Sequence, residues 1–185
     1  MAFQQTLQGH ITPADKAAND YYYVPFTLPM AARRLRVRYT YSAAMSSDEV
    51  TGGNVIDLGL FDPRGSDFPG GAGFRGWSGS ARPEFTIALD EATPGYLPGP
   101  LPPGEYHVIL GLYRIWGNGA DYEIAIEADL DADAPILFAD QQQDGRPYPP
   151  ATGTGAATQW LRGDLQSHTF HSDAKGSLEQ LVAKA

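Results

Sequence analysis

Short runs in which apolar and polar residues alternate follow one another from Phe3 to about Asp129. In residues 35–41 every second side chain is apolar, and residues 85–89, 106–112 and 122–126 repeat the pattern. Successive side chains of a β-strand point to opposite faces of a sheet, so a period of two buries one face of each strand and exposes the other. The alternation therefore predicts a mainly β fold for this part of the chain.

Clusters of turn-forming residues separate these runs, at positions 62–65, 69–71, 98–100 and 117–119. The cluster at 117–119 stands between two alternating runs and predicts a β-hairpin. About eight such strands in about 125 residues are typical of an antiparallel β-sandwich of jelly-roll or related type. The 21 glycines, 15 prolines and 18 tyrosines and phenylalanines (10 and 8) also favour strands and turns over helices.

The composition also argues against several classes of function. The 22 acidic and 13 basic residues give a net charge of −9, and an acidic surface repels phosphate backbones, so we expect no nucleic acid partner. The sequence has no cysteine, which removes disulfides, thiolate zinc sites and cysteine nucleophiles. Neither a signal peptide nor an apolar run of about 18 residues is recognisable. These features predict a soluble cytoplasmic protein with no membrane partner.

Composition divides the chain into three parts. Residues 1–139 carry the predicted strands of the sandwich, and we expect them to form an accessory domain. Residues 140–159 are polar and rich in Gly and Pro, which is typical of a linker or a long exposed loop. Residues 160–185 have a different pattern, which predicts the start of a second domain.

This third part predicts a short strand, a polar loop and a helix. Ser177 and Gln180 have the spacing of a capping box at a helix N-terminus. So short a helix is marginal without packing partners, and a βα unit needs a parallel strand to follow it. We therefore expect the chain to be a fragment or a truncated form of a longer protein. The apolar face of the predicted helix consists of Leu178, Leu181, Val182 and Ala185.

Residues 163–174 carry the strongest functional motif. They resemble the first motif of the PHP (polymerase and histidinol phosphatase) superfamily, in which a strand ends in His-x-His and an Asp follows after a short loop. The resemblance implies that His168 and Asp173 bind a metal, and that His171 lines the mouth of the pocket. Gln166 stands where the family has the first His, so it is a weaker ligand. Imidazole and carboxylate donors together suit Zn, Mn or Fe.

The resemblance extends into the first domain. Residues 23–26, 56–65, 74–79 and 92–99 look like the N-terminal β-domain of metallohydrolases of the CehA/McbA type, which are PHP proteins related to carbaryl hydrolase. The family implies a distorted (β/α)-barrel that hydrolyses phosphoesters or carbamate and carboxyl esters with divalent metal ions. The remaining ligands come from later strands of that barrel, so we expect this chain alone to be inactive and to bind no metal tightly. The implied partners are a small-molecule ester and the C-terminal barrel, and a homo-oligomer is left open.

Two weaker motifs have ordinary structural explanations. Asp129, Asp131 and Asp133 have the spacing that begins an EF-hand calcium loop, but Ala134 stands where the loop requires Gly. A solvated strand end is the better interpretation. The residues around Ser78 resemble a nucleophile elbow, but the second glycine is one residue early and no triad partner is placed for it.

A group of arginines and aromatics leaves three interpretations open. Arg75, Trp77 and Arg82 could form a stacking surface for a sugar or an anion, or a surface that docks on the barrel and forms one wall of its active site. The third interpretation is a packed loop in which Trp77 caps the sandwich and Arg75 pairs with Asp57 or Asp62. We expect His10 and His107, which are far apart in the sequence, to be structural and not ligands.

Two hypotheses about function follow. The first is an enzyme, in which residues 1–139 are the accessory domain of a PHP-type metal-dependent hydrolase. The second is a non-catalytic β-sandwich that binds a carbohydrate, another ligand or a partner subunit.

Overall fold

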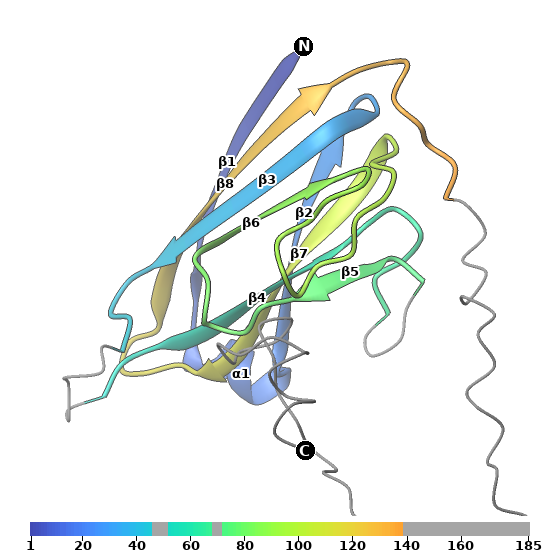
Figure 1. The fold of residues 1–185 in the computed structure, drawn as a ribbon. Coiled ribbons are helices and arrows are strands. Elements are labelled where there is room, and N and C mark those ends of the chain that lie inside the picture. Colours follow the sequence, from blue (N-terminus) through green and yellow to red (C-terminus); the bar gives the residue numbers. More distant parts are fainter. Residues whose placement is uncertain (46–51, 68–71, 139–185) are drawn as a thin grey trace, which may run out of the picture.

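Eight strands and one short helix form the part of the chain that the computed structural model describes, which is residues 1–45, 52–67 and 72–138 (Figure 1). The strands are arranged in two four-stranded sheets, with the orders β1-β8-β3-β6 and β2-β7-β4-β5. We call this part the two-sheet domain. Its elements are β1 (Ala2–Ile11), α1 (Pro13–Ala18), β2 (Tyr21–Leu28), β3 (Ala32–Tyr41), β4 (Val55–Phe61), β5 (Phe74–Trp77), β6 (Glu84–Ala88), β7 (Gly104–Arg114) and β8 (Ala120–Leu130).

The strands pair as they would in one long hairpin folded over on itself. β1 pairs with β8, β2 with β7, β3 with β6 and β4 with β5, and every pair is antiparallel. Two more antiparallel pairs, β3 with β8 and β4 with β7, join these ribbons into the two sheets. The prediction of a mainly β fold with about eight antiparallel strands is thus confirmed.

The two sheets share one hydrophobic core. Alternate residues of each strand point into it, as in β3, where Leu35 and Val37 are fully buried. Ring contacts link separate segments in this core, with the Phe26 and Tyr106 rings stacked 5.3 Å apart and those of Phe85 and Tyr96 4.0 Å apart. Burying each large apolar side chain of this kind stabilises the fold by about 1.5–3 kcal/mol.

The helix α1 carries the chain from the end of β1 in one sheet to β2 in the other. Thr12 caps it, because its hydroxyl accepts from the Asp15 amide and the Asp15 carboxylate accepts from the Thr12 amide. The bonds from Thr12 lower the pKa of the Asp15 carboxyl. Pro13 suits the first helical position, where the missing amide proton has no partner in any case. Within the described residues, no helix has the length and apolar character needed to cross a lipid bilayer.

The prediction of a β-hairpin at residues 117–119 is wrong. β7 and β8 flank this turn but lie in different sheets, so the turn crosses from one sheet to the other. Each of these strands already has two neighbours in its own sheet. Buried Asn54 holds the crossing, because its side chain donates to the Gly119 carbonyl and accepts from the Trp116 amide. The alternating pattern on each side is the same for a hairpin and for a crossing, which is why the sequence did not distinguish them.

The alternating pattern predicts a strand that includes Leu89, but β6 stops at Ala88 and Leu89 is 48% exposed. The predicted linker, residues 140–159, and the predicted start of a PHP domain, residues 160–185, lie outside the described residues.

Candidate functional site

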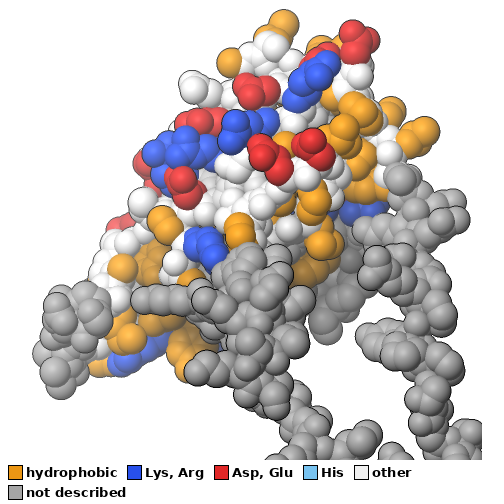
Figure 2. Space-filling view, in the orientation of Figure 1, with side chains coloured by type: hydrophobic (Ala, Val, Ile, Leu, Met, Phe, Trp, Pro, Cys, Tyr) orange, Lys and Arg blue, Asp and Glu red, His pale blue; other side chains and the backbone are white. Residues whose placement is uncertain are grey.

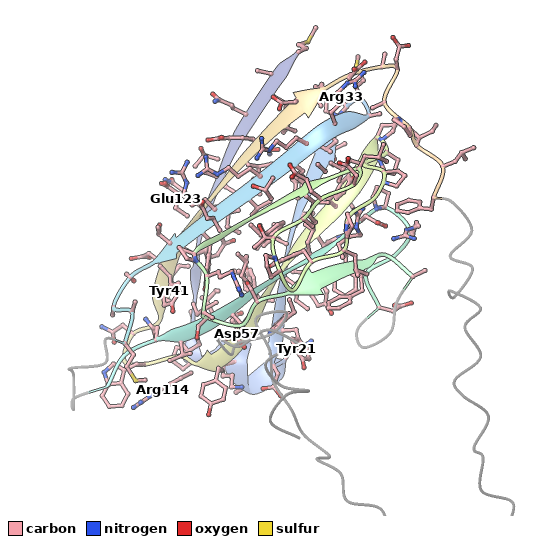
Figure 3. The ribbon with its side chains drawn as sticks, in the orientation of Figure 1. Tyr21, Arg33, Tyr41, Asp57, Arg114 and Glu123 are labelled. Carbon is pink, nitrogen blue, oxygen red and sulfur yellow. The ribbon has the colours of Figure 1, made fainter. Side chains whose placement is uncertain are left out.

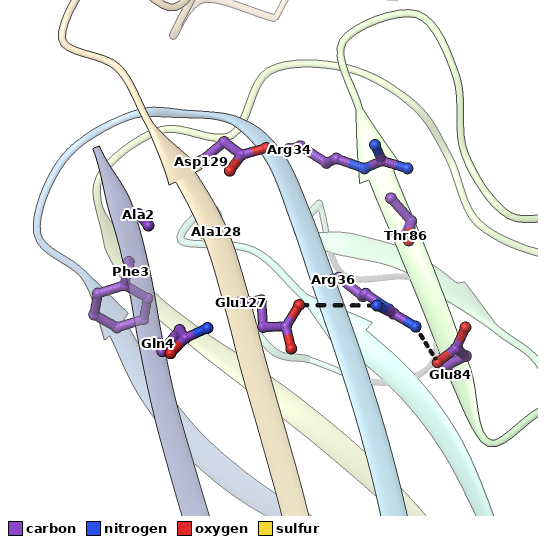
Figure 4. Close-up of a pocket in the computed structure, with 10 residues that line it drawn as sticks. All are labelled: Ala2, Phe3, Gln4, Arg34, Arg36, Glu84, Thr86, Glu127, Ala128 and Asp129. Carbon is purple, nitrogen blue, oxygen red and sulfur yellow. Dashed lines mark hydrogen bonds and ion pairs between the residues drawn. The ribbon is translucent and has the colours of Figure 1, made fainter.

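The outer face of the sheet β1-β8-β3-β6 is covered by charged side chains of both signs (Figure 2). Arg36 on β3 bridges Glu84 on β6 at 2.8 Å and Glu127 on β8 at 3.8 Å. The hydrogen bond that Arg36 donates to the Glu84 carboxylate is the main reason that the pKa of Arg36 is raised. These groups, with Arg34 and Asp129, line a shallow hollow of about 460 Å³ (Figure 4). Exposed ion pairs of this kind contribute little to stability, so we interpret this face as a solvated surface.

The outer face of the other sheet, β2-β7-β4-β5, is aromatic instead. Phe61 and Ile109 are fully buried there although they do not belong to the shared core. The Phe61 ring lies 6.2 Å from that of Tyr23 and 5.4 Å from that of Phe74. These side chains form a second apolar layer outside the sheet, which we call the outer aromatic layer: Tyr21, Tyr23, Phe61, Phe74, Trp77 and Ile109.

A groove of about 600 Å³ opens beside this layer, and we call it the Trp77 groove. Side chains from α1 and from all four strands of the sheet, or from their ends, surround it. Tyr21 and Asp57, which line it, come from the strands on either side of β7, and each pairs with Gly111 (Figure 3). The lining residues are Lys16, Asp20, Tyr21, Asp57, Phe74, Trp77, Gly111, Leu112 and Tyr113.

Two glycines beneath Trp77 explain why its ring lies on the sheet. Gly59 on β4 pairs with Trp77 on β5, and Gly111 is on the next strand, β7. A Cβ atom on Gly59 would come within 2.6 Å of the Trp77 ring, and one on Gly111 within 2.5 Å. The indole therefore lies directly against the backbone of two neighbouring strands. Any other residue at either position would lift it.

Tyr21 stands at the end of this indole. It pairs with Gly111 across β2 and β7, and its ring meets that of Trp77 at 6.2 Å and 83°. Tyr113, two residues beyond Gly111 on β7, is 76% exposed at the rim of the groove. Neither tyrosine was among the site residues predicted from the sequence. For Tyr21 a signal was present, since residues 21–28 carry aromatics on the outward as well as the inward positions of one strand.

Arg75 is not on a surface. Its side chain is 1% exposed, and it binds the Asp62 carboxylate at 3.2 Å as well as the carbonyls of Leu97 at 3.0 Å and Pro100 at 2.8 Å. Burial lowers the pKa of the Arg75 guanidinium, and the Asp62 carboxylate opposes that shift. The predicted pairing of Arg75 with Asp62 is confirmed, although Arg75 lies on strand β5 and not in a loop, and its burial leaves it no place on a stacking or docking surface.

The structure separates the other two residues of that predicted group. Trp77 lines the groove, whereas Arg82 is half-buried and does not belong to the lining. Ser78, beside Trp77 in the sequence, is 1% exposed, and its hydroxyl lies 3.0 Å from that of Tyr96. Burial raises the pKa of the Tyr96 phenol. Ser78 is thus part of a buried hydrogen-bonded pair and has no access to a substrate.

The carboxylate of Asp131, just after β8, is already engaged in hydrogen bonds within the protein. Asp131 accepts from the guanidinium of Arg33 and, at 2.9 Å, from the amide of Asp133. The bond from the Asp133 amide, followed by that from Arg33, lowers the pKa of the Asp131 carboxyl. Within residues 1–45, 52–67 and 72–138, no group of three or more His, Cys, Asp or Glu side chains is arranged to hold a metal ion.

The two histidines of the described residues are both held by neighbours in the fold. The His107 ring lies 3.5 Å from the Glu105 carboxylate. His10 Nδ1 lies 2.7 Å from Asp121 Oδ1, and its Nε2 lies 2.9 Å from the Asn118 carbonyl. The hydrogen bond to Asp121 is the main reason that the pKa of His10 is raised.

A pH dependence follows from the raised pKa of His10. The contribution of a group whose pKa is higher in the folded state is fully present below its unfolded value, about 6.5, and is lost as the pH rises through the folded value. We therefore expect the stability difference between wild type and His10→Gln to be larger at about pH 5.5 than at about pH 9. Thermal unfolding of both proteins at the two pH values measures this, with Asp121→Asn as the matched variant. An equal difference at both pH values would contradict it.

The predicted metal ligands His168, Asp173 and Gln166, and the predicted pocket residue His171, lie outside the described residues. A comparison of the chain with models of protein families gave no match, and a search of curated proteins gave none either.

Proposed function

We propose that the chain is the N-terminal portion of a PHP-type metal-dependent hydrolase that acts on phosphoester or carbamate and carboxyl ester bonds. In this proposal residues 1–139 are a jelly-roll β-sandwich that serves as an accessory domain, residues 140–159 are a linker and residues 160–185 begin the catalytic barrel. The observation that carries the proposal is the motif of residues 163–174, with His168 and Asp173 at the positions of metal ligands.

The donor chemistry of this motif fits a transition metal. Imidazole, carboxylate and amide oxygen are a mixed donor set that suits Zn, Mn or Fe, with Gln166 as the weakest of the three. When bound, such a metal activates water and polarises the scissile ester. His168 and Asp173 would hold the metal, and His171 would lie at the mouth of the pocket.

A second support comes from where the other resembling runs fall in the two-sheet domain. Residues 56–65 and 74–79 contain Asp62 and Arg75, the buried ion pair. Residues 92–99 contain Leu97, whose carbonyl accepts from Arg75. The runs therefore contain residues that meet in one buried cluster of this fold, which supports a resemblance at the level of the fold.

Zinc titration tests the proposal. In isothermal titration, we expect the 185-residue chain to bind Zn²⁺ weakly and Gln166→His to bind it about tenfold more tightly, because an imidazole replaces an amide. The double variant His168→Ala/Asp173→Ala is the control and should lose the binding, while His107→Ala should not. We also expect no turnover of an aryl ester or a phosphodiester by this chain alone. If Gln166→His binds Zn²⁺ no better than the double variant, the proposal is wrong.

The Trp77 groove favours a second candidate function, that of a binding module. The groove has a size typical of small-molecule sites, about 300–1,000 Å³, and combines aromatic rings with a few charged groups. A binding module and an accessory domain are compatible, because a hydrolase can carry its ligand-binding site on a separate domain. The binding function needs no metal and is therefore tested separately.

A further inference from the structure

The floor of the Trp77 groove is a flat indole ring with a rigid support. The ring rests on the backbone of Gly59 and Gly111, and the Trp77 amide donates to the Gly95 carbonyl at 3.1 Å. Tyr21 meets the indole nearly at a right angle, 83° between ring planes, and so forms an upright wall beside the floor. Rings held in this way lose little conformational freedom when a ligand stacks on them.

Charged side chains of both signs line the same groove. Lys16 at the end of α1 forms an ion pair with Asp20, four residues on, and Asp57 on β4 is half-buried. One positive and two negative groups give the lining a net charge of −1. This charge disfavours phosphate and carboxylate ligands. The same negative charge and the aromatic rings would also attract a quaternary ammonium ion, so choline serves as a competitor in the test.

A neutral ligand with one flat apolar face and hydroxyls around its edge matches these features. The sugar ring of a pyranose has such a face, formed by its axial C–H groups. Its hydroxyls both donate and accept, so carboxylates and an ammonium can bind them together. A ring stacked on the indole would bury apolar area, while the polar groups at the rim would fix its orientation.

We propose that the Trp77 groove binds a neutral saccharide, with Trp77 as the stacking platform, Tyr21 and Tyr113 as walls, and Lys16, Asp20 and Asp57 as partners for its hydroxyls. This inference rests on the second candidate function, the binding module, and needs no metal site.

Affinity electrophoresis tests the proposal. A protein with a net charge of −9 migrates readily in a native gel, and a bound polysaccharide in the gel retards it. The probes are soluble β-glucan, xylan, galactomannan and starch, with acidic pectin as the charged comparison. We expect wild type to be retarded by at least one neutral polymer and not selectively by pectin. Retardation by pectin alone, or by none of the five, would overturn the proposal.

Variants locate the binding. Tyr113→Ala should weaken the retardation at least tenfold. Because the Tyr113 side chain is 76% exposed, its removal should leave the domain folded, so unfolding would not explain the weaker binding. Trp77→Ala should abolish the retardation. Trp116→Ala, which removes a half-exposed indole away from the groove, is the matched control and should be retarded like wild type. Equal retardation of Tyr113→Ala, Trp77→Ala and wild type would place the ligand elsewhere and overturn the proposal.

Two further arms separate this proposal from the other possibilities. Choline chloride should not release the protein from the polymer, and release by choline would identify the groove as a cation site instead. The double variant His168→Ala/Asp173→Ala should be retarded like wild type. A failure of the metal proposal would therefore leave this result unchanged, and a failure of saccharide binding would leave the zinc titration unchanged.

Discussion

Replacement of Asp62 by alanine is expected to lower the free energy of unfolding by about 3–5 kcal/mol. The reason is that Asp62 is 1% exposed and compensates the guanidinium of Arg75, which is equally buried. Without the carboxylate, Arg75 would remain in the interior as an uncompensated charge. Arg64, which also binds Asp62, at 2.8 Å, would lose its partner as well. Urea unfolding followed by circular dichroism measures the loss.

An exposed ion pair provides the control. Arg36→Ala breaks the bridges to Glu84 and Glu127, whose members are all about two-fifths accessible, and we expect a much smaller loss of stability than for Asp62→Ala. Arg75→Lys should destabilise the domain despite keeping the charge, because a lysine cannot reach Asp62 and the carbonyls of the 97–100 segment together. If Asp62→Ala costs no more than Arg36→Ala, the buried pair does not hold the domain together.

The pair of Asp62 and Arg75 also shows how much of the fold could be predicted from the sequence. A buried arginine needs a carboxylate, so Asp57 and Asp62 were both candidates for Arg75. The choice depends on which side of the sheet each side chain reaches, and Asp57 points outward into the Trp77 groove. The contact between β5 and the segment before β7 is long-range, and no local pattern specifies it.

The strands could be predicted because alternation is a local property. β3, β7 and β8 each contain the run that predicted them, and β6 contains all of its run except Leu89. Sheet membership is different, because it depends on pairing between segments far apart in the sequence. The turn at 117–119 illustrates this, since β7 pairs with β2 and β4, whereas β8 pairs with β1 and β3.

The candidate site was found only in part for a related reason. Trp77 could be singled out as an aromatic residue in a Gly-rich run, but its function as a floor depends on Gly59 and Gly111. A glycine within a strand suggests a close approach of some other group without naming it. The approaching group is Trp77, and only the pairing of β4 with β5 and β7 brings the three residues together.

A second large effect is expected at Gly76, which brings β5 and the 95–97 segment together. Gly76 has a φ of +135°, and a Cβ atom there would lie 2.2 Å from the Gly95 carbonyl oxygen and 2.5 Å from the Tyr96 Cα. Both neighbours are backbone, so no side chain can move aside. Gly76→Ala must therefore push this segment away and weaken the bonds on either side, from the Leu97 amide to the Arg75 carbonyl and from the Trp77 amide to the Gly95 carbonyl.

Gly65 separates the two sources of this cost. It has nearly the same φ, +132°, but nothing lies within 4 Å of a Cβ atom there. Gly65→Ala therefore measures the backbone strain alone, about 1–3 kcal/mol. Gly76→Ala should cost about 1–3 kcal/mol more, because the collision adds to the strain. Because Gly76 lies between Arg75 and Trp77, Gly76→Ala should also disturb the Trp77 groove, and Gly65→Ala should not. Equal losses of stability in urea unfolding would mean that the 95–97 segment does not press on β5, and the buried position of Arg75 beneath it would then need another explanation.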